Sequence, residues 1–383
     1  MHKYFNVAGP CREDEHYMID ATERLHYELE NLIEKNQYFA VSASSNSGKT
    51  TFATTLVNKI NNQGDLEAVY YSFKDISTEE KAIEDLFDSI QNDNNVEKMV
   101  VIFDDINCLN DNALLLFLRI IRNGYIQRSF APFPSSIILI GNQSNISLKF
   151  RIRSYLLRLD STSPFDLIHQ LELRNFTKEE VYLLYNQHTM ATGQVFEKSA
   201  VELVFEQTQG QPWLVNAIAR EVVEKQLKKD FSITITPQMI ETAINTIILR
   251  RDVHIDQLLD KLKDERVKKI VEPMILGESG NIERMSDDFN YVLDLGLIKV
   301  EKNGIMPANP IYAEVIIRTL SYDSQEDLAE SKPLYQMPRY FQNDRIDMEL
   351  LLTDFQQFWR ENSAVWEERY QYKEAAPHLI LQA

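Results

Sequence analysis

Short apolar runs in the first half of the chain alternate with longer stretches of amphipathic pattern. The apolar runs are residues 38–41, 68–72, 99–103 and 137–141. Nearly continuous runs of this length are typical of strands that are buried on both faces of a parallel sheet. Helical spacing of apolar residues is found between these runs, at 52–60, 77–91 and 110–123. Because strands alternate with helices, the pattern predicts an α/β fold with a parallel sheet.

The second half of the chain, from Phe165 onward, has a helical pattern. The predicted helices are residues 178–190, 197–208, 212–228, 238–250, 254–263, 266–276 and 287–295. Thr177 and Glu180 form a capping-box pattern before the first of them. Gly210 would end the second helix and Pro212 would begin the third.

A turn signal near residue 300 predicts a β-hairpin, because Lys302-Asn303-Gly304 lies between two runs that contain apolar residues. Three helices followed by a hairpin are the pattern of a winged helix, and residues 309–320 would supply a closing helix. The third of these helices, 287–295, is acidic, which favours a packing or switching role over the reading of DNA bases. A DNA-binding regulator stays open as the alternative.

These patterns divide the chain into five parts. We expect an α/β core at 1–165, a helical lid at 166–250, a winged helix at 251–322, a polar linker at 323–344 and a helical, aromatic tail at 345–383. The tail finishes on an apolar segment, so we expect it to be the start of a further domain or to dock on another surface.

Composition narrows the classes of function. The chain has 383 residues, a net charge of −18 and two cysteines, Cys11 and Cys108. The negative charge argues against nonspecific binding of nucleic acid or anionic membrane over the whole surface. The cysteines lie far apart in the sequence and the N-terminus lacks the apolar core of a signal peptide, so we expect reduced thiols in a cytoplasmic protein. No apolar run approaches the roughly 18 residues of a membrane span.

The segment between the first strand and the next helix contains the strongest functional motif, Gly48-Lys49-Thr50. A strand, a small polar loop and then Gly-Lys-Thr at the start of a helix is the Walker A arrangement, in which backbone N–H groups bind phosphate. Lys49 would reach the β- and γ-phosphates of ATP, and Thr50 would hold Mg²⁺. A chance serine-rich turn is the alternative. The candidate nucleotide-binding residues are Ala43, Ser44, Ser45, Asn46, Ser47, Gly48, Lys49, Thr50 and Thr51.

Two acids follow the third apolar run, in the pattern of a Walker B motif. Asp104 would hold Mg²⁺ together with Thr50. Asp105 stands where a glutamate usually polarises the attacking water, and its carboxylate would sit about 1.5 Å further back because aspartate is one methylene shorter. A misplacement of that order can cost roughly a hundredfold in rate, so we expect slow hydrolysis. A surface Asp-Asp turn that caps a strand is the alternative.

Further candidates follow the fourth run. Asn142 could hydrogen-bond the γ-phosphate or the attacking water, although a simple Gly-Asn turn is the alternative. Lys49, Asp105 and Asn142 are therefore the catalytic candidates. One strand lies between the Walker A strand and the acids, which favours the ASCE/AAA+ arrangement of P-loop proteins. A basic patch follows, which contains Lys149, Arg151, Arg153 and Arg158. It would supply a trans-acting arginine in an assembly, or it is ordinary solvated surface.

The N-terminal segment precedes the Walker A strand. Asp20 followed by Glu23 predicts a capping box for a first helix that ends near residue 35. His16, Tyr17 and Arg24 could pack beside a nucleotide base. Plain packing of the N-terminus is the equal alternative.

Taken together, these motifs resemble those of prokaryotic ATP-binding proteins of the AAA+/STAND-like kind. The loop of that family commonly reads A-P-R-Q-x-G-K-T-T, which is similar to residues 43–51 here, with Ser44 for Pro and Ser45 for Arg. The family's Asp-Glu corresponds to Asp104-Asp105. Its lid carries a Gly-x-Pro associated with nucleotide sensing, which would involve Pro212. The segments that resemble its N-terminus, lid and winged-helix end are 5–11, 16–18, 173–185, 210–216 and 309–312.

The resemblance implies an ATP- and Mg²⁺-dependent molecular switch with slow hydrolysis, in which the lid closes on the core and the winged helix moves. It also implies a protein partner or self-assembly. Members of the family often continue into a PD-(D/E)XK nuclease-like domain, to which no residue of this chain can be assigned. Besides the DNA-binding regulator, an interaction scaffold with a structural nucleotide site is a further alternative.

Overall fold

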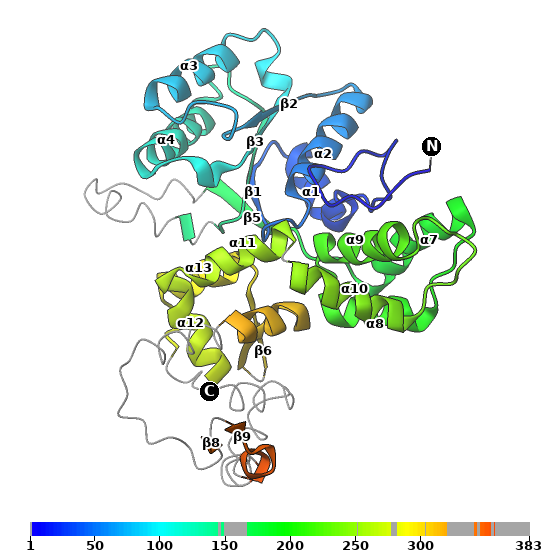
Figure 1. Cartoon of the computed structure of the whole chain (residues 1–383). Coiled ribbons are helices and arrows are strands. Elements are labelled where there is room, and N and C mark those ends of the chain that lie inside the picture. The colour runs from blue at the N-terminus through cyan, green and yellow to red at the C-terminus, as the bar shows by residue number, and fades with distance from the viewer. Residues whose placement is uncertain are drawn as a thin grey trace.

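The computed structural model shows three groups of elements in chain order, a sheet flanked by helices, a helical group and a second helical group with a hairpin (Figure 1). The part of the chain that the structure describes is residues 2–144, 147–148, 167–250, 252–276, 282–302, 304–319, 341–342, 345–353 and 356. The basic patch at Lys149, Arg151, Arg153 and Arg158 lies outside the described residues. Within the described part, no helix is long and apolar enough to cross a membrane.

The sheet has five parallel strands in the order β2-β3-β4-β1-β5. They are β1 (Tyr38–Ser42), β2 (Glu67–Ser72), β3 (Met99–Asp104), β4 (Ser136–Gly141) and β5 (Ile168–Glu172). The predicted parallel sheet is thus confirmed. In the sheet, β4 lies between β1 and β3. In the sequence, β2 lies between them, but it forms an edge of the sheet.

Strand β5 was not predicted, because the sequence from Phe165 onward reads as helical. It pairs with β1 from Tyr38↔Ile168 to Ser42↔Glu172. Only Ile168 and Leu171 of this strand are buried, while the polar residues between them are exposed. An edge strand with so few apolar residues lacks the continuous run that identified the other four strands.

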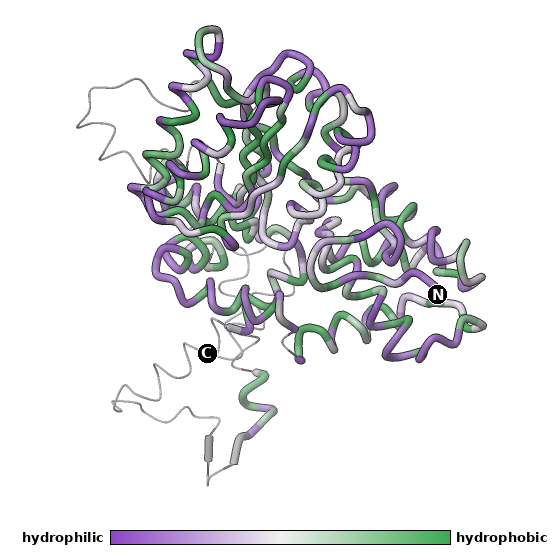
Figure 2. Tube along the Cα trace, turned by 90° about the horizontal axis from the view of Figure 1, so that it is seen from above, coloured by the Kyte–Doolittle hydropathy of each residue, from purple (hydrophilic) through white to green (hydrophobic). Residues whose placement is uncertain are grey.

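Helices cover both faces of the sheet. They are α1 (His26–Glu34) and α2 (Lys49–Gln63) on one face, and α3 (Glu80–Gln91) and α4 (Asp111–Gln127) on the other. Side chains alternate along β3, so that Val100 and Ile102 join the cluster around α1 and α2, and Val101 and Phe103 join the cluster around α3 and α4. Figure 2 shows apolar positions along the strands and polar positions on the outer turns of the helices.

The predicted capping box at Asp20 is wrong. A short 3₁₀ turn, Glu23–Leu25, precedes α1, and no side chain caps that helix. Asp20 instead accepts hydrogen bonds from the N–H and hydroxyl of Thr22, at 2.9 and 2.6 Å, and pairs with Lys59 at 2.7 Å. Aspartate forms such local turns readily, and they compete with a helix cap.

The group after β5 is helical, as the apolar pattern predicted, and its role as a lid stays a prediction. It contains α7 (Lys178–Thr192), α8 (Lys198–Thr208), α9 (Pro212–Arg220) and α10 (Pro237–Arg250), and α9 continues into a π-helical turn at Glu221–Gln226. The predicted capping box of Thr177 and Glu180 is present in both directions. Pro212 begins α9, as predicted.

The last group has the element order predicted for a winged helix. Helices α11 (Val253–Leu262), α12 (Glu265–Leu276) and α13 (Asp287–Asp294) precede an antiparallel hairpin of β6 (Ile298–Glu301) and β7 (Gly304–Pro307), and residues 310–319 are helical. Its buried residues form one cluster with those of the helical lid. A second small hairpin, β8 (Phe341–Gln342) and β9 (Arg345–Ile346), lies where a linker was predicted to end.

Candidate functional site

The loop between β1 and α2 contains two residues with positive φ, Asn46 and Gly48. Gly48, the residue before α2, has a φ of 93°, which disfavours any residue with a Cβ. Ser47 is buried, and its hydroxyl donates to the carbonyl of Ser44 at 2.6 Å. Ala43 is buried and needs no positive φ, so alanine is accommodated where the motif usually has glycine. The start of α2 adds backbone N–H groups that point toward the loop.

Lys49 is folded back onto this loop. Its ammonium donates to the carbonyl oxygens of Ala43 at 3.0 Å and Ser44 at 2.6 Å. Burial lowers the pKa of Lys49 to about 8, and the charges of Asp104 and Asp105 oppose that shift. An anion on the loop would stabilise the charged ammonium further, which is what a phosphate-binding lysine requires.

Asp104, at the end of β3, is fully buried and is held by three donors. Its Oδ2 accepts from the hydroxyls of Thr50 at 3.0 Å and Tyr70 at 3.1 Å, and its Oδ1 accepts from the backbone N–H of Asp105 at 2.8 Å. Burial raises the pKa of Asp104, and the charge of Asp105 adds to that effect. Such a carboxylate would be stabilised by a cation. Tyr70 was not among the predicted site residues.

The donor set fits Mg²⁺ that is held jointly with a nucleotide. Thr50 and Asp104 supply a hydroxyl and a carboxylate that already touch each other. Within the described ranges, no group of three or more His, Cys, Asp or Glu side chains could form a metal cage. Mg²⁺ is typically bound by one or two protein oxygens together with substrate phosphates and water.

Asp105 has an unusual backbone conformation, with a φ of 58°. Its Oδ2 accepts from the hydroxyl of Ser72 at 3.1 Å, and its Oδ1 lies 2.7 Å from the ammonium of Lys74. Ser72 ends β2, the strand beside β3, so both partners come from the neighbouring strand end. Left-handed backbone in a non-glycine residue is often found at functional sites. Sequence reasoning identified Asp105 and missed both partners.

Asn142 lies at the same edge of the sheet, directly after β4. Its backbone N–H donates to the side-chain oxygen of Asn107 at 3.4 Å. Its own side-chain oxygen is buried and has no hydrogen-bond partner among the described residues. A cavity of about 490 Å³ lies beside it, with Arg266 and Tyr291 of the last helical group among the lining residues. An amide with unused hydrogen-bonding capacity in this place fits the predicted contact with substrate or water.

The lid meets the loop through Gln211, the residue before Pro212. The side-chain amide of Gln211 donates to the carbonyls of Ser45 at 3.4 Å and Asn46 at 3.3 Å, while its oxygen caps α9 at Leu214. Pro212 is buried at the first turn of α9, and its predicted contact with nucleotide stays a prediction. The residue that touches the loop is the middle one of the Gly-Gln-Pro triplet.

The last helical group also contacts the loop. Asn46 Nδ2 lies 2.7 Å from His254 Nδ1 and 3.3 Å from Gln257 Oε1, both on α11. His254 Nε2 lies 2.6 Å from the hydroxyl of Tyr312, and its ring packs against Trp213 with centroids 4.9 Å apart. We refer to Asn46, His254, Gln257 and Tyr312 as the loop clasp. No sequence motif pointed to it.

A close backbone contact lies beside the loop clasp. Gly296, which follows α13, has a φ of 73°, and a Cβ built on it would lie 2.3 Å from the Cβ of Ser44. No larger residue fits there without moving this group away from the phosphate loop. Ser144, after β4, donates to Asp294 of α13 through its N–H at 2.9 Å and its hydroxyl at 3.2 Å. The end of α13 therefore contacts two loops at the same edge of the sheet.

The loop clasp predicts a dependence of stability on pH. Burial lowers the pKa of His254 from 6.5 to about 4, so the folded protein keeps a neutral ring where the unfolded chain binds a proton. The stabilisation is complete above pH 6.5 and is lost as the pH falls toward 4, by at most about 3 kcal/mol. Urea unfolding of wild type and His254→Gln at pH 7 and pH 4.5 measures this loss of folding stability. We expect a smaller loss for the variant, and an unchanged loss for the control His169→Gln on the exposed face of β5. Equal losses in all three would contradict the assignment.

The N-terminal candidates do not gather around the loop. His16 Nδ1 accepts from the N–H of Arg12 at 2.8 Å, and the hydroxyl of Tyr17 lies 3.3 Å from His188. Of the three residues, only Arg24 lies near the loop. Its Nη2 is 3.8 Å from the position that a Cβ on Gly48 would occupy. The base-packing role therefore stays a prediction for all three.

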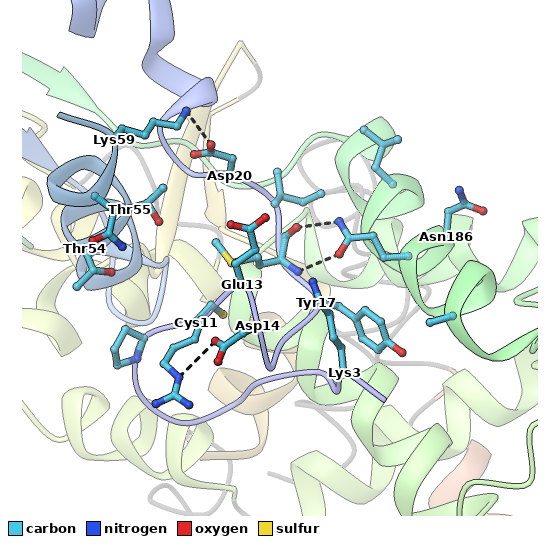
Figure 3. A pocket seen from close by; sticks show the side chains of 18 of the residues that line it. Lys3, Cys11, Glu13, Asp14, Tyr17, Asp20, Thr54, Thr55, Lys59 and Asn186 are labelled. Carbon is cyan, nitrogen blue, oxygen red and sulfur yellow. Dashed lines mark hydrogen bonds and ion pairs between the residues drawn. The ribbon is translucent and has the colours of Figure 1, made fainter. Parts of the chain in front are cut away.

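The N-terminal segment bridges the core and the lid. It lies along a cavity of about 1510 Å³ between α2 and α7, shown in Figure 3. The N–H of Cys11 donates to the hydroxyl of Thr51 at 2.9 Å, and the backbone of Met18 exchanges two hydrogen bonds with Gln187. The segment is thus hydrogen-bonded to α2 at one end and to α7 at the other.

Comparisons with known proteins support the fold. No protein-family model matches the chain, and a search among curated proteins found no match. The Walker-type ATPase PABY2304 of Pyrococcus abyssi superposes with a TM-score of 0.51 at 14% identity, over 82% of this chain and 99% of that chain. The RuvB Holliday junction branch migration motor of Thermotoga maritima gives 0.43 at 16%, over 82% and 95%. Cdc6p of Pyrobaculum aerophilum gives 0.41 at 13%, over 84% and 96%.

The two lower scores add nothing to the assignment, which rests on the first similarity and on the strand order. One strand, β4, separates the Walker A strand β1 from β3, which carries Asp104 and Asp105. That is the arrangement predicted for the ASCE/AAA+ type. The chain therefore has an α/β P-loop fold, followed by a helical group and by a second helical group that contains a hairpin.

Proposed function

We propose that this protein is a Mg-ATP-binding P-loop ATPase in which the bound nucleotide controls the position of the lid and the winged-helix group. One observation carries the switching part of this proposal: the apex of the phosphate loop is held by both groups. Gln211 of the lid binds the carbonyls of Ser45 and Asn46, and His254 of the last group binds the Asn46 side chain. A change in the conformation of the loop would therefore alter contacts of both the lid and the last helical group.

The chemistry follows from the residues gathered at the carboxyl edge of the sheet. Backbone N–H groups of the loop and Lys49 would bind the β- and γ-phosphates. Mg²⁺ held by Thr50 and Asp104 would neutralise charge on the phosphates. Asp105 would accept a proton from a water whose oxygen bonds to the γ-phosphorus while the bond to the bridging oxygen breaks, giving ADP and phosphate. Asn142 would orient that water or the γ-phosphate.

Slow hydrolysis is part of the proposal. Asp105 has a shorter side chain than glutamate, and both of its oxygens are already bound, to Ser72 and to Lys74. A carboxylate that is bound to an ammonium has to be released before it can accept a proton from water. The switch would then remain in its ATP state for long periods between turnovers.

The division into domains stays part of the proposal, with the core extended through β5 because that strand pairs with β1. The winged-helix group is assigned to packing and switching. Its third helix, α13, begins with Asp287 and Asp288, which would repel a DNA backbone. A cytoplasmic location fits Cys11 and Cys108, which are both free thiols. A protein partner or self-assembly remains the expected output of the switch.

The mass and radius of gyration in solution, measured with ADP, with a non-hydrolysable ATP analogue and without nucleotide, test this function. We expect wild type to differ between ADP and the analogue, because only the analogue would bring a γ-phosphate to the loop that both groups contact. Even without nucleotide, the Gly296→Leu variant should have the radius of gyration of one of the two nucleotide-bound states. The reason is that the leucine side chain would displace the winged-helix group from Ser44. Wild type that binds neither nucleotide would end the proposal.

A further inference from the structure

A second lysine lies at the candidate catalytic centre, and the proposed function treats it only as a partner of Asp105. Lys74 follows β2 by two residues, and its ammonium lies 2.7 Å from Oδ1 of Asp105. The Lys74 side chain is 64% exposed, whereas that of Asp105 is 12% exposed. The ammonium is thus attached to a nearly buried acid at the end of a long, mostly exposed stem, which has room to change partners.

The position of Lys74 relative to the phosphate loop is set by the sheet. β2 pairs with β3 so that Ser72 lies opposite Asp104, and the chain then turns over the end of β3. A chain of contacts links Lys74 to the start of α2: Lys74 binds Asp105, the N–H of Asp105 donates to Asp104 at 2.8 Å, and the hydroxyl of Thr50 donates to Asp104 at 3.0 Å. Lys74 therefore lies close to the residues that would hold the metal ion and the phosphates.

The charges at this edge of the sheet balance as the structure stands. Asp104 and Asp105 supply two negative charges, and Lys49 and Lys74 supply two positive charges. A Mg²⁺ ion with a bound ATP would add net negative charge, and the terminal phosphate would bring the highest density of it. The phosphate would then compete with Asp105 for the Lys74 ammonium, since ammonium groups bind phosphate oxygens strongly.

We propose that Lys74 is a phosphate-binding residue that moves from Asp105 to the γ-phosphate when ATP binds and returns to Asp105 when only ADP is left. The move does two things at once. It adds a cation to the group on which charge develops during phosphoryl transfer, and it frees Asp105 to accept a proton from water. Ser72 remains bound to Asp105 and keeps its carboxylate in place while Lys74 is away.

This inference rests on the proposed function and goes beyond it, because it assigns the discrimination between ATP and ADP to one residue. ADP lacks the γ-phosphate, so it offers Lys74 no better partner than Asp105. Lys74 should therefore contribute to the binding of ATP and not to that of ADP. Lys49, which would reach both the β- and the γ-phosphate, should contribute to both.

The test compares Lys74→Gln, Lys74→Arg and wild type by calorimetric titration with ADP and a non-hydrolysable ATP analogue, and by steady-state turnover. For Lys74→Gln we expect the Kd of the ATP analogue to rise about tenfold and the Kd of ADP to stay within about twofold, as for the loss of one charged hydrogen bond. The kcat should fall by a similar factor. Lys74→Arg should keep most of the preference for ATP, because it keeps the charge. Lys81→Gln, on the exposed face of α3, is the matched control and should resemble wild type.

Three results would overturn the assignment. A faster kcat in Lys74→Gln with unchanged affinity for the ATP analogue would mean that Lys74 only restrains Asp105. An equal loss of affinity for ADP and the analogue would mean a general electrostatic effect. Unchanged affinity and turnover would mean that Lys74 has no part in the site. Wild type that binds neither nucleotide would refute the proposed function and this inference together, and is thereby distinguishable from the other three.

Discussion

Lys49→Ala is expected to lower the rate of ATP turnover by at least about a hundredfold, which is the usual cost of removing a charged group that stabilises a transition state. Nucleotide binding should weaken as well, for both ATP and ADP. The reason is local: Lys49 is the cation closest to the phosphate loop and already binds the carbonyls of Ala43 and Ser44. The fold should persist, because the ammonium makes no contact that holds the core together.

Turnover and fluorescent-nucleotide binding measure this effect, and the matched control is Lys59→Ala on the same helix. Lys59 pairs with Asp20 and Glu23 at 2.7 Å each, away from the loop. We expect the control to bind nucleotide as wild type does, with at most a small loss of stability from the exposed pairs. If Lys49→Ala retained wild-type turnover, the loop would not be the phosphate site, whatever its sequence suggests.

Asp104→Asn is expected to have the second large effect. It should abolish the dependence of ATP turnover on Mg²⁺, with a loss of roughly a hundredfold or more in rate, because the buried carboxylate is the acid that the metal requires. The same change should leave the thermal stability in metal-free buffer equal to that of wild type or higher. Burial raises the pKa of Asp104, which means that the folded protein disfavours this charge when no cation is near.

A large loss of turnover without a loss of stability makes the result informative. A purely structural acid would lose stability when it is replaced, and a solvated surface acid would change neither quantity. Thermal melts with and without Mg²⁺ and ATP, together with turnover at several Mg²⁺ concentrations, separate these outcomes. Asp65→Asn, at an exposed position between α2 and β2, is the control. A variant whose turnover still rises with Mg²⁺ would remove Asp104 from the metal site.

A change in the phosphate group bound at the loop would affect distant parts of the chain, because these parts contact the loop. Three segments that are separate in the sequence converge on the loop: the start of α9, the start of α11 and the turn after α13. Their contacts are made to Ser44, Ser45 and Asn46, which belong to the candidate phosphate-binding loop. A loop held from three sides cannot change its conformation without altering at least one of those contacts.

The elements of the core and the two nucleotide motifs could be predicted from the sequence. Four strands are continuous apolar runs, and Gly48-Lys49-Thr50 and Asp104-Asp105 follow strands at their carboxyl ends. These patterns are local, since a buried strand and a phosphate loop each depend on a few consecutive residues. The strand β5 could not be predicted in this way, because only Ile168 and Leu171 face the core.

The partners of the site residues were decided by the tertiary structure alone. Ser72 and Lys74 hold Asp105 because β2 pairs with β3, and no pattern in the sequence fixes which strands are neighbours. His254 meets Asn46 across a separation of 208 residues, through the packing of one helical group on another. Local periodicity determines which residues form a strand, a helix or a loop. The contacts that would make the loop a switch depend on how these elements pack, and only the folded chain settles that.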